Sequence, residues 1–148
     1  MASTRAAAGI YEDRSGPILV DFLREQGFDT PAARVVPDAN MAAAVDAGFA
    51  EAPHVLLTSG GTGISPDDNT VECVAPYLDK QLPGIAHAFY TASASVPTAA
   101  ISRAIAGFNA RTFAMALPGS TGAAKDATRV LAPLLNHIVN QLEGHHEH

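Results

Sequence analysis

The stretch Val55-Leu-Leu-Thr-Ser-Gly-Gly-Thr-Gly-Ile-Ser-Pro-Asp-Asp-Asn-Thr-Val-Glu72 decides how this chain folds. Its first three residues form a short apolar run, which is typical of a strand buried on both faces of a parallel sheet. Three glycines interleaved with hydroxyl residues follow, at Gly60, Gly61 and Gly63. The polar residues 67–70 then offer several caps for a helix. We therefore predict a strand, a glycine-rich turn and a helix N-terminus in succession.

This succession has a chemical meaning. A glycine turn that leads into a helix points backbone N–H groups at an anion. In open α/β sheets, ligands bind at the carboxyl ends of the strands, where this turn would lie. Asp67 and Asp68 occupy the same loop, and their charges would repel a bare phosphate. A Mg²⁺ ion that keeps most of its waters would bridge the two, so the stretch predicts a nucleotide or phosphate site with a metal.

Length and composition narrow the class of protein. At 148 residues the chain is expected to form a single domain, 1–148, with a sizeable core. A net charge of -6 without a Lys/Arg cluster argues against a nucleic-acid partner. No apolar run is long enough for a membrane span, and the first ten residues lack the apolar core of a signal peptide, so a cytoplasmic location is expected. Cys73 is the only cysteine, which excludes an internal disulfide.

Helices and strands are predicted to alternate along the rest of the chain. Apolar periodicity and cap residues predict helices from about Pro17 to Gly27, over 41–51, from Asn69 with a kink or end at Pro76, over 85–91, over 97–107, and over about 123–142 with a bend at Pro133. Strands are expected at 34–36, at 55–57 and at 112–117. This alternation predicts an α/β fold with a mostly parallel sheet.

A second glycine loop, Leu117-Pro118-Gly119-Ser120-Thr121-Gly122, follows the strand predicted at 112–117. It repeats the order of the first: a strand, a turn with glycines and hydroxyls, and the start of a helix. If the two strands are neighbours, both loops open on the same edge of the sheet. One ligand could then bridge them.

The ordered set of motifs resembles the molybdopterin adenylyltransferase family of molybdenum cofactor biosynthesis, over essentially the whole chain. The residues that carry the resemblance are Ser3-Thr4-Arg5-Ala6-Ala7-Ala8-Gly9 with Tyr11 and Asp13, Val36-Pro37-Asp38, Thr58-Ser59-Gly60-Gly61-Thr62-Gly63 with Asp68 and Thr70, Leu82-Pro83-Gly84, Ser102-Arg103, and Leu117-Pro118-Gly119-Ser120 with Lys125. The resemblance implies the family's three-layer fold, with helices on both faces of the sheet. It also implies a nucleotidyltransferase that moves AMP from ATP to the terminal phosphate of molybdopterin and releases pyrophosphate. A homotrimer and a metal-insertion partner protein are implied as well.

The resemblance also assigns roles by position. Asp38 and Asp68 match the family's functionally important acidic residues, and Asp68 would hold Mg²⁺ with Asp38 completing the shell through water. The nucleotide phosphates would lie against Ser59, Gly60, Gly61, Thr62 and Gly63. The molybdopterin phosphate would lie toward Pro118, Gly119, Ser120 and Lys125. Simpler roles stay open: Asp68 as a helix cap, Asp38 as a turn residue and Lys125 as a solvated side chain.

Three departures from the family pattern affect these expectations. The family has an apolar strand before the Ser-Thr-Arg position, where this chain has only two residues, so the first strand is expected to be truncated. Asp67 stands where a non-acidic residue is frequent, which predicts a stronger dependence on metal. His87 and Tyr90 replace a Glu and an Arg.

Two other functions remain open after these departures. The pattern Pro66-Asp67-Asp68-Asn69-Thr70 is similar to one in a related domain of competence-damage-inducible proteins, which implies a nucleotide pyrophosphatase acting on a dinucleotide such as ADP-ribose. The changes at His87 and Tyr90, with the short N-terminus, leave open a non-catalytic molybdopterin-binding protein.

Overall fold

Residues 15–144 are the part of the chain that the computed structural model describes, and they contain both helices and strands. The helices are α2 (Ser15–Glu25), α3 (Met41–Ala50), α4 (Thr70–Val74), α5 (Pro83–Ala92), α6 (Thr121–Leu131) and α7 (Leu135–Leu142). The strands are β1 (Val55–Ser59), β2 (Lys80–Gln81), β3 (Ile105–Phe108) and β4 (Phe113–Leu117). Three short 3₁₀ turns join them: η1 (Asp38–Asn40), η2 (Ala75–Tyr77) and η3 (Pro97–Ile101).

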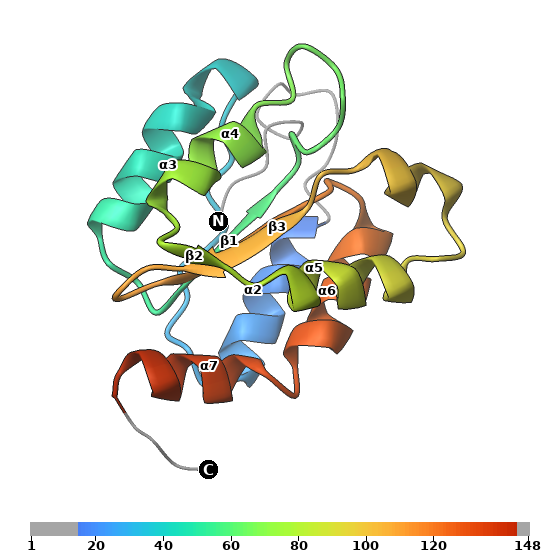
Figure 1. The fold of residues 1–148 in the computed structure, drawn as a ribbon. Helices are drawn as coiled ribbons and strands as arrows, with labels where there is room; N and C mark the ends of the chain where they lie inside the picture. The colour runs from blue at the N-terminus through green and yellow to red at the C-terminus, as the bar shows by residue number, and fades with distance from the viewer. Residues whose placement is uncertain (1–14, 145–148) are drawn as a thin grey trace.

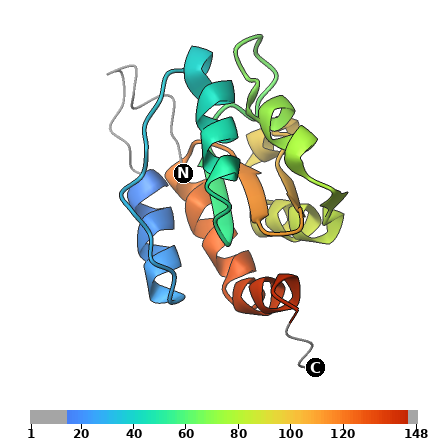
Figure 2. The same ribbon diagram turned by 90° about the vertical axis from the view of Figure 1, so that its left-hand side faces the viewer.

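The described strands form one sheet in the order β1-β4-β3-β2. β1 and β4 are parallel, with Val55 opposite Phe113 and Ser59 opposite Leu117. β3 is antiparallel to both of its neighbours, so β1, β4 and β2 point one way and β3 points the other. Helices cover both faces of this sheet, as Figures 1 and 2 show. The predicted three-layer α/β fold with a mostly parallel sheet is confirmed.

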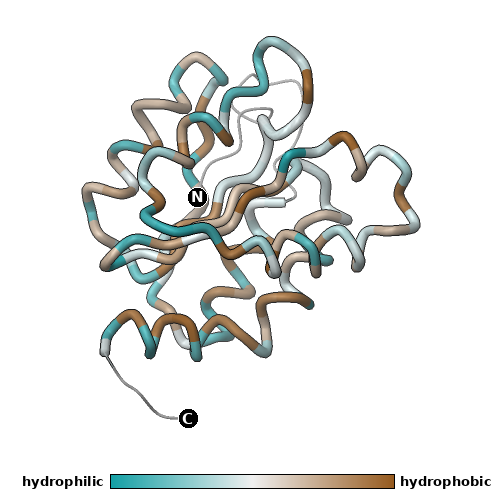
Figure 3. The backbone as a smooth tube through the Cα atoms, viewed as in Figure 1, coloured by the Kyte–Doolittle hydropathy of each residue, from teal (hydrophilic) through white to brown (hydrophobic). Residues whose placement is uncertain are grey.

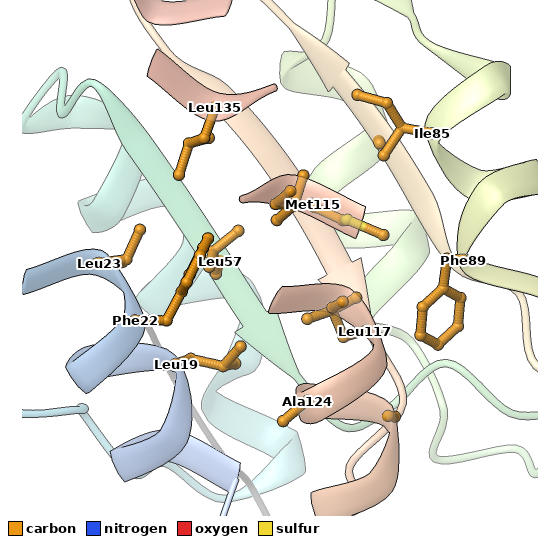
Figure 4. Close-up of a cluster of buried hydrophobic side chains, with 14 of the residues drawn as sticks. Leu19, Phe22, Leu23, Leu57, Ile85, Phe89, Met115, Leu117, Ala124 and Leu135 are labelled. Atoms are coloured by element: carbon orange, nitrogen blue, oxygen red, sulfur yellow. The ribbon is translucent and has the colours of Figure 1, made fainter. Parts of the chain in front are cut away.

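Alternation along β1 and β4 separates two hydrophobic cores. Leu57 and Met115 face one layer, where they pack among side chains of α2, α5, α6 and α7 (Figure 4). Leu56 and Ala114 face the other layer, which α3 and α4 cover. Because successive strand residues point to opposite faces, both sides of each strand must be apolar, as its sequence is. Both strands are thereby held firmly, and their carboxyl ends fix the positions of the loops that follow.

The helix predicted over 97–107 is wrong. Residues 97–101 form η3, and β3 begins four residues later. The small residues there permit a helix, but pairing with β4 and β2 decides the conformation. Gly107 is needed in that strand, because a Cβ atom there would lie 2.5 Å from the Lys80 carbonyl oxygen. The close approach of β2 therefore explains Gly107, the residue at which the predicted helix would end.

Other predicted elements need smaller changes. The strand expected at 34–36 is wrong as an element, because the structure has only an isolated bridge at Arg34. The single helix predicted over 123–142 is two helices, α6 and α7, and the break at Pro133 is where the bend was expected. Figure 3 shows the alternation of hydrophobic and hydrophilic residues along α7. The helix predicted over 85–91 begins two residues earlier, because Pro83 belongs to the first turn of α5.

Some expectations lie outside the described residues. The truncated first strand and the motif residues from Ser3 to Asp13 fall before residue 15. Within 15–144, no helix has the length and apolar character needed to cross a membrane.

Candidate functional site

The two glycine loops meet at one edge of the sheet. The backbone N–H of Gly60, directly after β1, donates to the carbonyl oxygen of Leu117 at the end of β4, over 2.8 Å. A Cβ atom at Gly119 would lie 3.3 Å from the Gly60 Cα, so the two backbones are in close contact. The expectation that both loops open on the same sheet edge is confirmed.

A cavity of about 400 Å³ lies between these loops. Its walls come from both loops, from η1, from the end of α5, from η3 and from the first turns of α6. The predicted site residues that line it are Asp38, Gly60, Gly61, Thr62, Gly63, Asp68, Pro118, Gly119 and Ser120. The fold thus brings together residues that are up to 82 positions apart in the chain, from Asp38 to Ser120.

Two predicted site residues lie outside the cavity lining. Ser59 is 1% exposed, and its hydroxyl shares a hydrogen bond of 2.8 Å with that of Ser15 on α2. Lys125 is exposed on α6. Ser59 therefore joins α2 to the end of β1, and Lys125 offers its charge from outside the cavity.

The first loop follows a path that requires glycine. Gly60 and Gly61 have φ angles of 97° and 71°, in the left-handed region that side chains disfavour. At Gly61 a Cβ atom would also lie 2.1 Å from the Thr70 Oγ1. The Thr70 N–H donates to the Gly61 carbonyl over 3.0 Å. The loop is thus folded tightly against the start of α4.

Asp68 lies over this loop instead of capping α4. Its Oδ2 accepts a hydrogen bond of 3.0 Å from the backbone N–H of Ser65, and a Cβ atom on Gly63 would come within 2.6 Å of that oxygen. The N-cap residue of α4 is Asn69, which makes no side-chain cap bond. Helix capping therefore does not explain Asp68, whose carboxylate is part of the cavity wall.

Arg103 donates several hydrogen bonds to the same loop. Its Nε donates to the Gly63 carbonyl over 2.9 Å, and its Nη2 donates to the Asp68 carbonyl over 2.8 Å. Its backbone N–H donates to the Thr62 carbonyl over 2.8 Å. An ion pair with Glu72 completes the set. The hydrogen bond from Arg103 lowers the pKa of the Glu72 carboxyl, and the same bond raises the pKa of the guanidinium.

The second loop leads directly into α6, an eleven-residue helix. Ser120 is its N-cap, and its Oγ accepts from the Ala123 N–H over 3.0 Å. The cavity lining includes Gly119, Gly122 and Ala123, so the first turn of α6 faces the cavity. In general, the first N–H groups of a helix have no partner within the helix, and they and the positive end of the helix dipole favour a phosphate there.

The structure adds a pair of polar residues that sequence reasoning missed. Ser93, at the end of α5, donates its hydroxyl to Asp126 Oδ2 over 2.7 Å, and both residues line the cavity. Asp126 is 8% exposed and forms an ion pair with Arg129. One signal was available: Asp126 follows Ala123 by three positions, at the spacing of the buried face of α6. A charged residue at that spacing marks either a cavity wall or a buried ion pair.

A resident metal cage is absent from the described part of the chain, where no three His, Cys, Asp or Glu side chains gather. Mg²⁺ does not need such a cage, because it binds nucleotides through one or two carboxylates plus phosphate oxygens and water. Asp68 and Asp38 line the same cavity and supply oxygen ligands. The donor set therefore fits a Mg²⁺ ion that arrives with a nucleotide.

A larger cavity, of about 540 Å³, lies beside β1. Its walls are formed by residues around Phe28 and Pro31, by α3 and by Val55 to Thr58, and it includes none of the predicted site residues. Size alone would favour it as a binding site. Convergent glycine loops, a helix N-terminus and carboxylates favour the cavity of about 400 Å³.

Comparison with known proteins places these features in a family. The family model described as "Probable molybdopterin binding domain" matches residues 1–137. A molybdenum cofactor biosynthesis bifunctional protein of Chlorobaculum tepidum is 38% identical over 145 residues, which is 96% of this chain and 46% of that protein. The chain therefore spans about half the length of that relative. Molybdenum cofactor biosynthesis protein B of Bacillus subtilis is 37% identical over 88% of this chain and 81% of its own length.

A solved structure agrees with the sequence relatives. The molybdopterin biosynthesis Mog protein from Mycobacterium ulcerans is 39% identical, and it superposes with a TM-score of 0.87 over 95% of this chain and 94% of its own. Matches in sequence and in fold thus cover nearly the whole chain, both glycine loops included. The chain belongs to the molybdopterin binding domain family.

Proposed function

We propose that this chain transfers AMP from ATP to the terminal phosphate of molybdopterin and releases pyrophosphate, as a step of molybdenum cofactor biosynthesis. The observation that carries the proposal is the hydrogen bond between Gly60 and Leu117, which joins two phosphate-type loops at one cavity. A reaction between two phosphate-bearing substrates needs two adjacent anion sites. Family membership supports molybdopterin as one of the two substrates.

ATP is assigned to the first loop. Its backbone turns at Gly60 and Gly61, and both residues line the cavity, so phosphate oxygens can approach the main chain there. Asp68 adds a carboxylate at the same wall. Asp68 would hold Mg²⁺ there and Asp38 would complete its shell through water, and the ion when bound would supply positive charge against the triphosphate. The chain itself would align the α-phosphate along the loop backbone, and Asp68 and Asp38 would hold the cation.

The molybdopterin phosphate is assigned to the second loop. Gly119 and Gly122 expose the backbone next to the first turn of α6, whose N–H groups favour an anion. Ser120 already accepts a hydrogen bond as the helix cap, so its side chain fixes the loop and leaves its hydroxyl hydrogen for the phosphate. Lys125, exposed on the next turn, is proposed to add a positive charge near the entering substrate.

The reaction needs alignment more than a protein nucleophile. A phosphate oxygen of molybdopterin forms a bond to the α-phosphorus of ATP, and the bond from that phosphorus to the bridging oxygen of the β-phosphate breaks. Pyrophosphate leaves with the electron pair. The attacking phosphate is already largely deprotonated near neutral pH, so no general base is required. Positioning by the two loops and neutralisation of charge are what the protein supplies.

The assembly is also a proposal. By family resemblance we propose a homotrimer in the cytoplasm that hands its product to a metal-insertion partner protein. The Chlorobaculum tepidum relative is named bifunctional, and this chain covers 46% of it. That length leaves room in the relative for a second activity beside the domain that this chain matches.

Product analysis tests the proposed function. Purified protein is incubated with α-labelled ATP, Mg²⁺ and molybdopterin, and the labelled product and pyrophosphate are measured. Adenylated molybdopterin formed in equal amount to pyrophosphate is the expected result. Release of AMP from ADP-ribose without molybdopterin would identify a pyrophosphatase instead. Tight molybdopterin binding without any turnover would identify a non-catalytic binding protein.

A further inference from the structure

We propose that Arg103 and Tyr90 form a positioning pair that holds the first glycine loop, and with it Asp68, in its working conformation. The part of this inference that concerns ATP binding rests on the proposed function, whereas its structural part does not. The loop in question is residues 60–68, between the end of β1 and the start of α4. Neither Arg103 nor Tyr90 lines the cavity, so both would act through the loop.

Arg103 holds the loop at both of its ends. Its backbone and side chain together reach the carbonyl oxygens of Thr62, Gly63 and Asp68 at 2.8, 2.9 and 2.8 Å. The Ser102 hydroxyl adds a hydrogen bond of 3.0 Å to that of Thr62. Among the described residues, the hydrogen bonds that join 62–69 to any segment outside 60–74 come from these two residues. The loop's geometry thus depends on them.

An arginine beside a phosphate site would ordinarily be assigned to the phosphate. Here the guanidinium is already directed elsewhere: Nε and Nη2 donate to carbonyl oxygens, and Nη1 donates to Glu72. The planar fork of arginine fits several fixed acceptors at once, which a lysine ammonium on a flexible stem cannot do. The geometry points to loop positioning as the task of Arg103.

Tyr90 fixes Arg103 in turn. Its hydroxyl donates to the Ser102 carbonyl over 2.5 Å and accepts from the Ala104 N–H over 2.8 Å. One oxygen atom of α5 therefore holds the backbone on both sides of Arg103. Tyr90 stands where the family resemblance expects an arginine, so this bridge belongs to the chain's own sequence.

The consequence concerns Asp68 most directly. Its carbonyl is held by Arg103, while its carboxylate lies over Gly63, whose carbonyl Arg103 also holds. Ile64, in between, is 72% exposed, so packing contributes little to the order of this segment. Loss of the hydrogen bonds made by Arg103 or Tyr90 should move the Asp68 carboxylate relative to the cavity and weaken binding of Mg²⁺ with ATP.

Two conservative variants test the pair, each with a matched control. Arg103→Lys keeps the charge but loses the fork, and Tyr90→Phe keeps the ring but loses the bridging oxygen. Arg111→Lys changes an exposed arginine between β3 and β4, and Tyr77→Phe removes a hydroxyl that binds Asp46 on the other face of the sheet. Amide hydrogen exchange over residues 62–69 is measured without ligand, and the Kd for Mg²⁺ with ATP is measured by calorimetry.

Both test variants should exchange these amides about tenfold faster and bind Mg²⁺ with ATP about tenfold more weakly, with molybdopterin affinity unchanged. The controls should match the wild type. The double variant should lose little more than either single variant, because the two residues act in one chain of contacts.

Wild-type exchange and wild-type affinity in Arg103→Lys would overturn the proposal, as would an unaffected Tyr90→Phe. If the wild type protects the amides of residues 62–69 from exchange but forms no product, the proposed function is rejected. The exchange rates of the two variants would still decide the positioning role.

Discussion

Gly60 donates its backbone N–H to the carbonyl oxygen of Leu117 across 2.8 Å, and this bond unites two loops that are 57 residues apart in the chain. It extends the parallel pairing of β1 and β4 by one step beyond Ser59. Both strands are buried on two faces, so close packing in the core fixes the distance between the two loops. A substrate held by one loop is thereby placed next to a substrate held by the other.

Substitution of Gly61 should disable the first loop without unfolding the sheet. Gly61→Ala places a Cβ atom 2.1 Å from the Thr70 Oγ1 and forces alanine to a φ of 71°. The backbone strain alone costs about 1–3 kcal/mol. We expect ATP binding to be lost, as calorimetry would show, while circular dichroism stays that of a folded protein. Gly84→Ala is the control: it has open space in α5 and should raise the melting temperature slightly. Normal ATP binding by Gly61→Ala would remove this loop from the nucleotide site.

Asp68→Asn should abolish adenylation and leave the fold intact. An amide oxygen still accepts the hydrogen bond from Ser65, so the loop keeps its turn while the charge that faces the cavity is lost. Turnover should fall by about a hundredfold or more. Asp67→Asn makes a suitable comparison, since Asp67 is exposed and lies outside the cavity lining. That variant should retain turnover and need less Mg²⁺. Unchanged turnover in Asp68→Asn would exclude Asp68 from the mechanism.

Lys125→Ala should weaken molybdopterin binding more than ATP binding. Lys125 is exposed and lies outside the cavity lining, so its charge acts through solvent and the loss should be only about two- to fivefold. Added salt should diminish the difference from the wild type. Binding titrations with each substrate measure this. Equal losses for both substrates would mean that Lys125 serves neither phosphate in particular.

Acid should loosen the first loop before it unfolds the protein. Arg103 lowers the pKa of Glu72 below its ordinary value of 4.5. A carboxyl with a lowered folded pKa contributes stability that is present above pH 4.5 and is lost as the pH falls through the lower folded value. In the wild type, binding of Mg²⁺ with ATP should therefore decline as the pH falls below 4.5 and through the lowered pKa of Glu72. In Glu72→Gln the part of this decline that comes from protonation of Glu72 should be missing. An identical pH dependence of binding in the two proteins would contradict a role for the pair of Glu72 and Arg103.

The sequence predicted most of what positions the site. The apolar runs before Ser59 and before Pro118 identified the two buried strands, since a strand covered on both faces has little freedom in composition. The glycine positions then placed the loops. Gly107 misled the prediction because its reason is the close approach of the Lys80 backbone, a tertiary contact.

Long-range polar contacts explain the remaining gaps. Asp126 meets Ser93 from 33 residues away, and Tyr90 meets the backbone of Ala104 through a side-chain oxygen. Helical periodicity places Asp126 on the buried face of α6, but it does not identify Ser93 as the partner. Asp68 had two plausible roles from sequence, and the geometry over Gly63 decided against simple helix capping. Local patterns thus locate the loops, whereas the contacts that hold the loops in place appear only in the folded chain.

The central claim is that the two glycine loops form one substrate site, and a crystal structure with a non-hydrolysable ATP analogue and Mg²⁺ tests it most directly. The account predicts phosphates along Gly60 to Gly63, a cation on Asp68, and room for a second phosphate at Gly119 and Ser120. A nucleotide bound in the larger cavity beside β1, with both glycine loops empty, would contradict it.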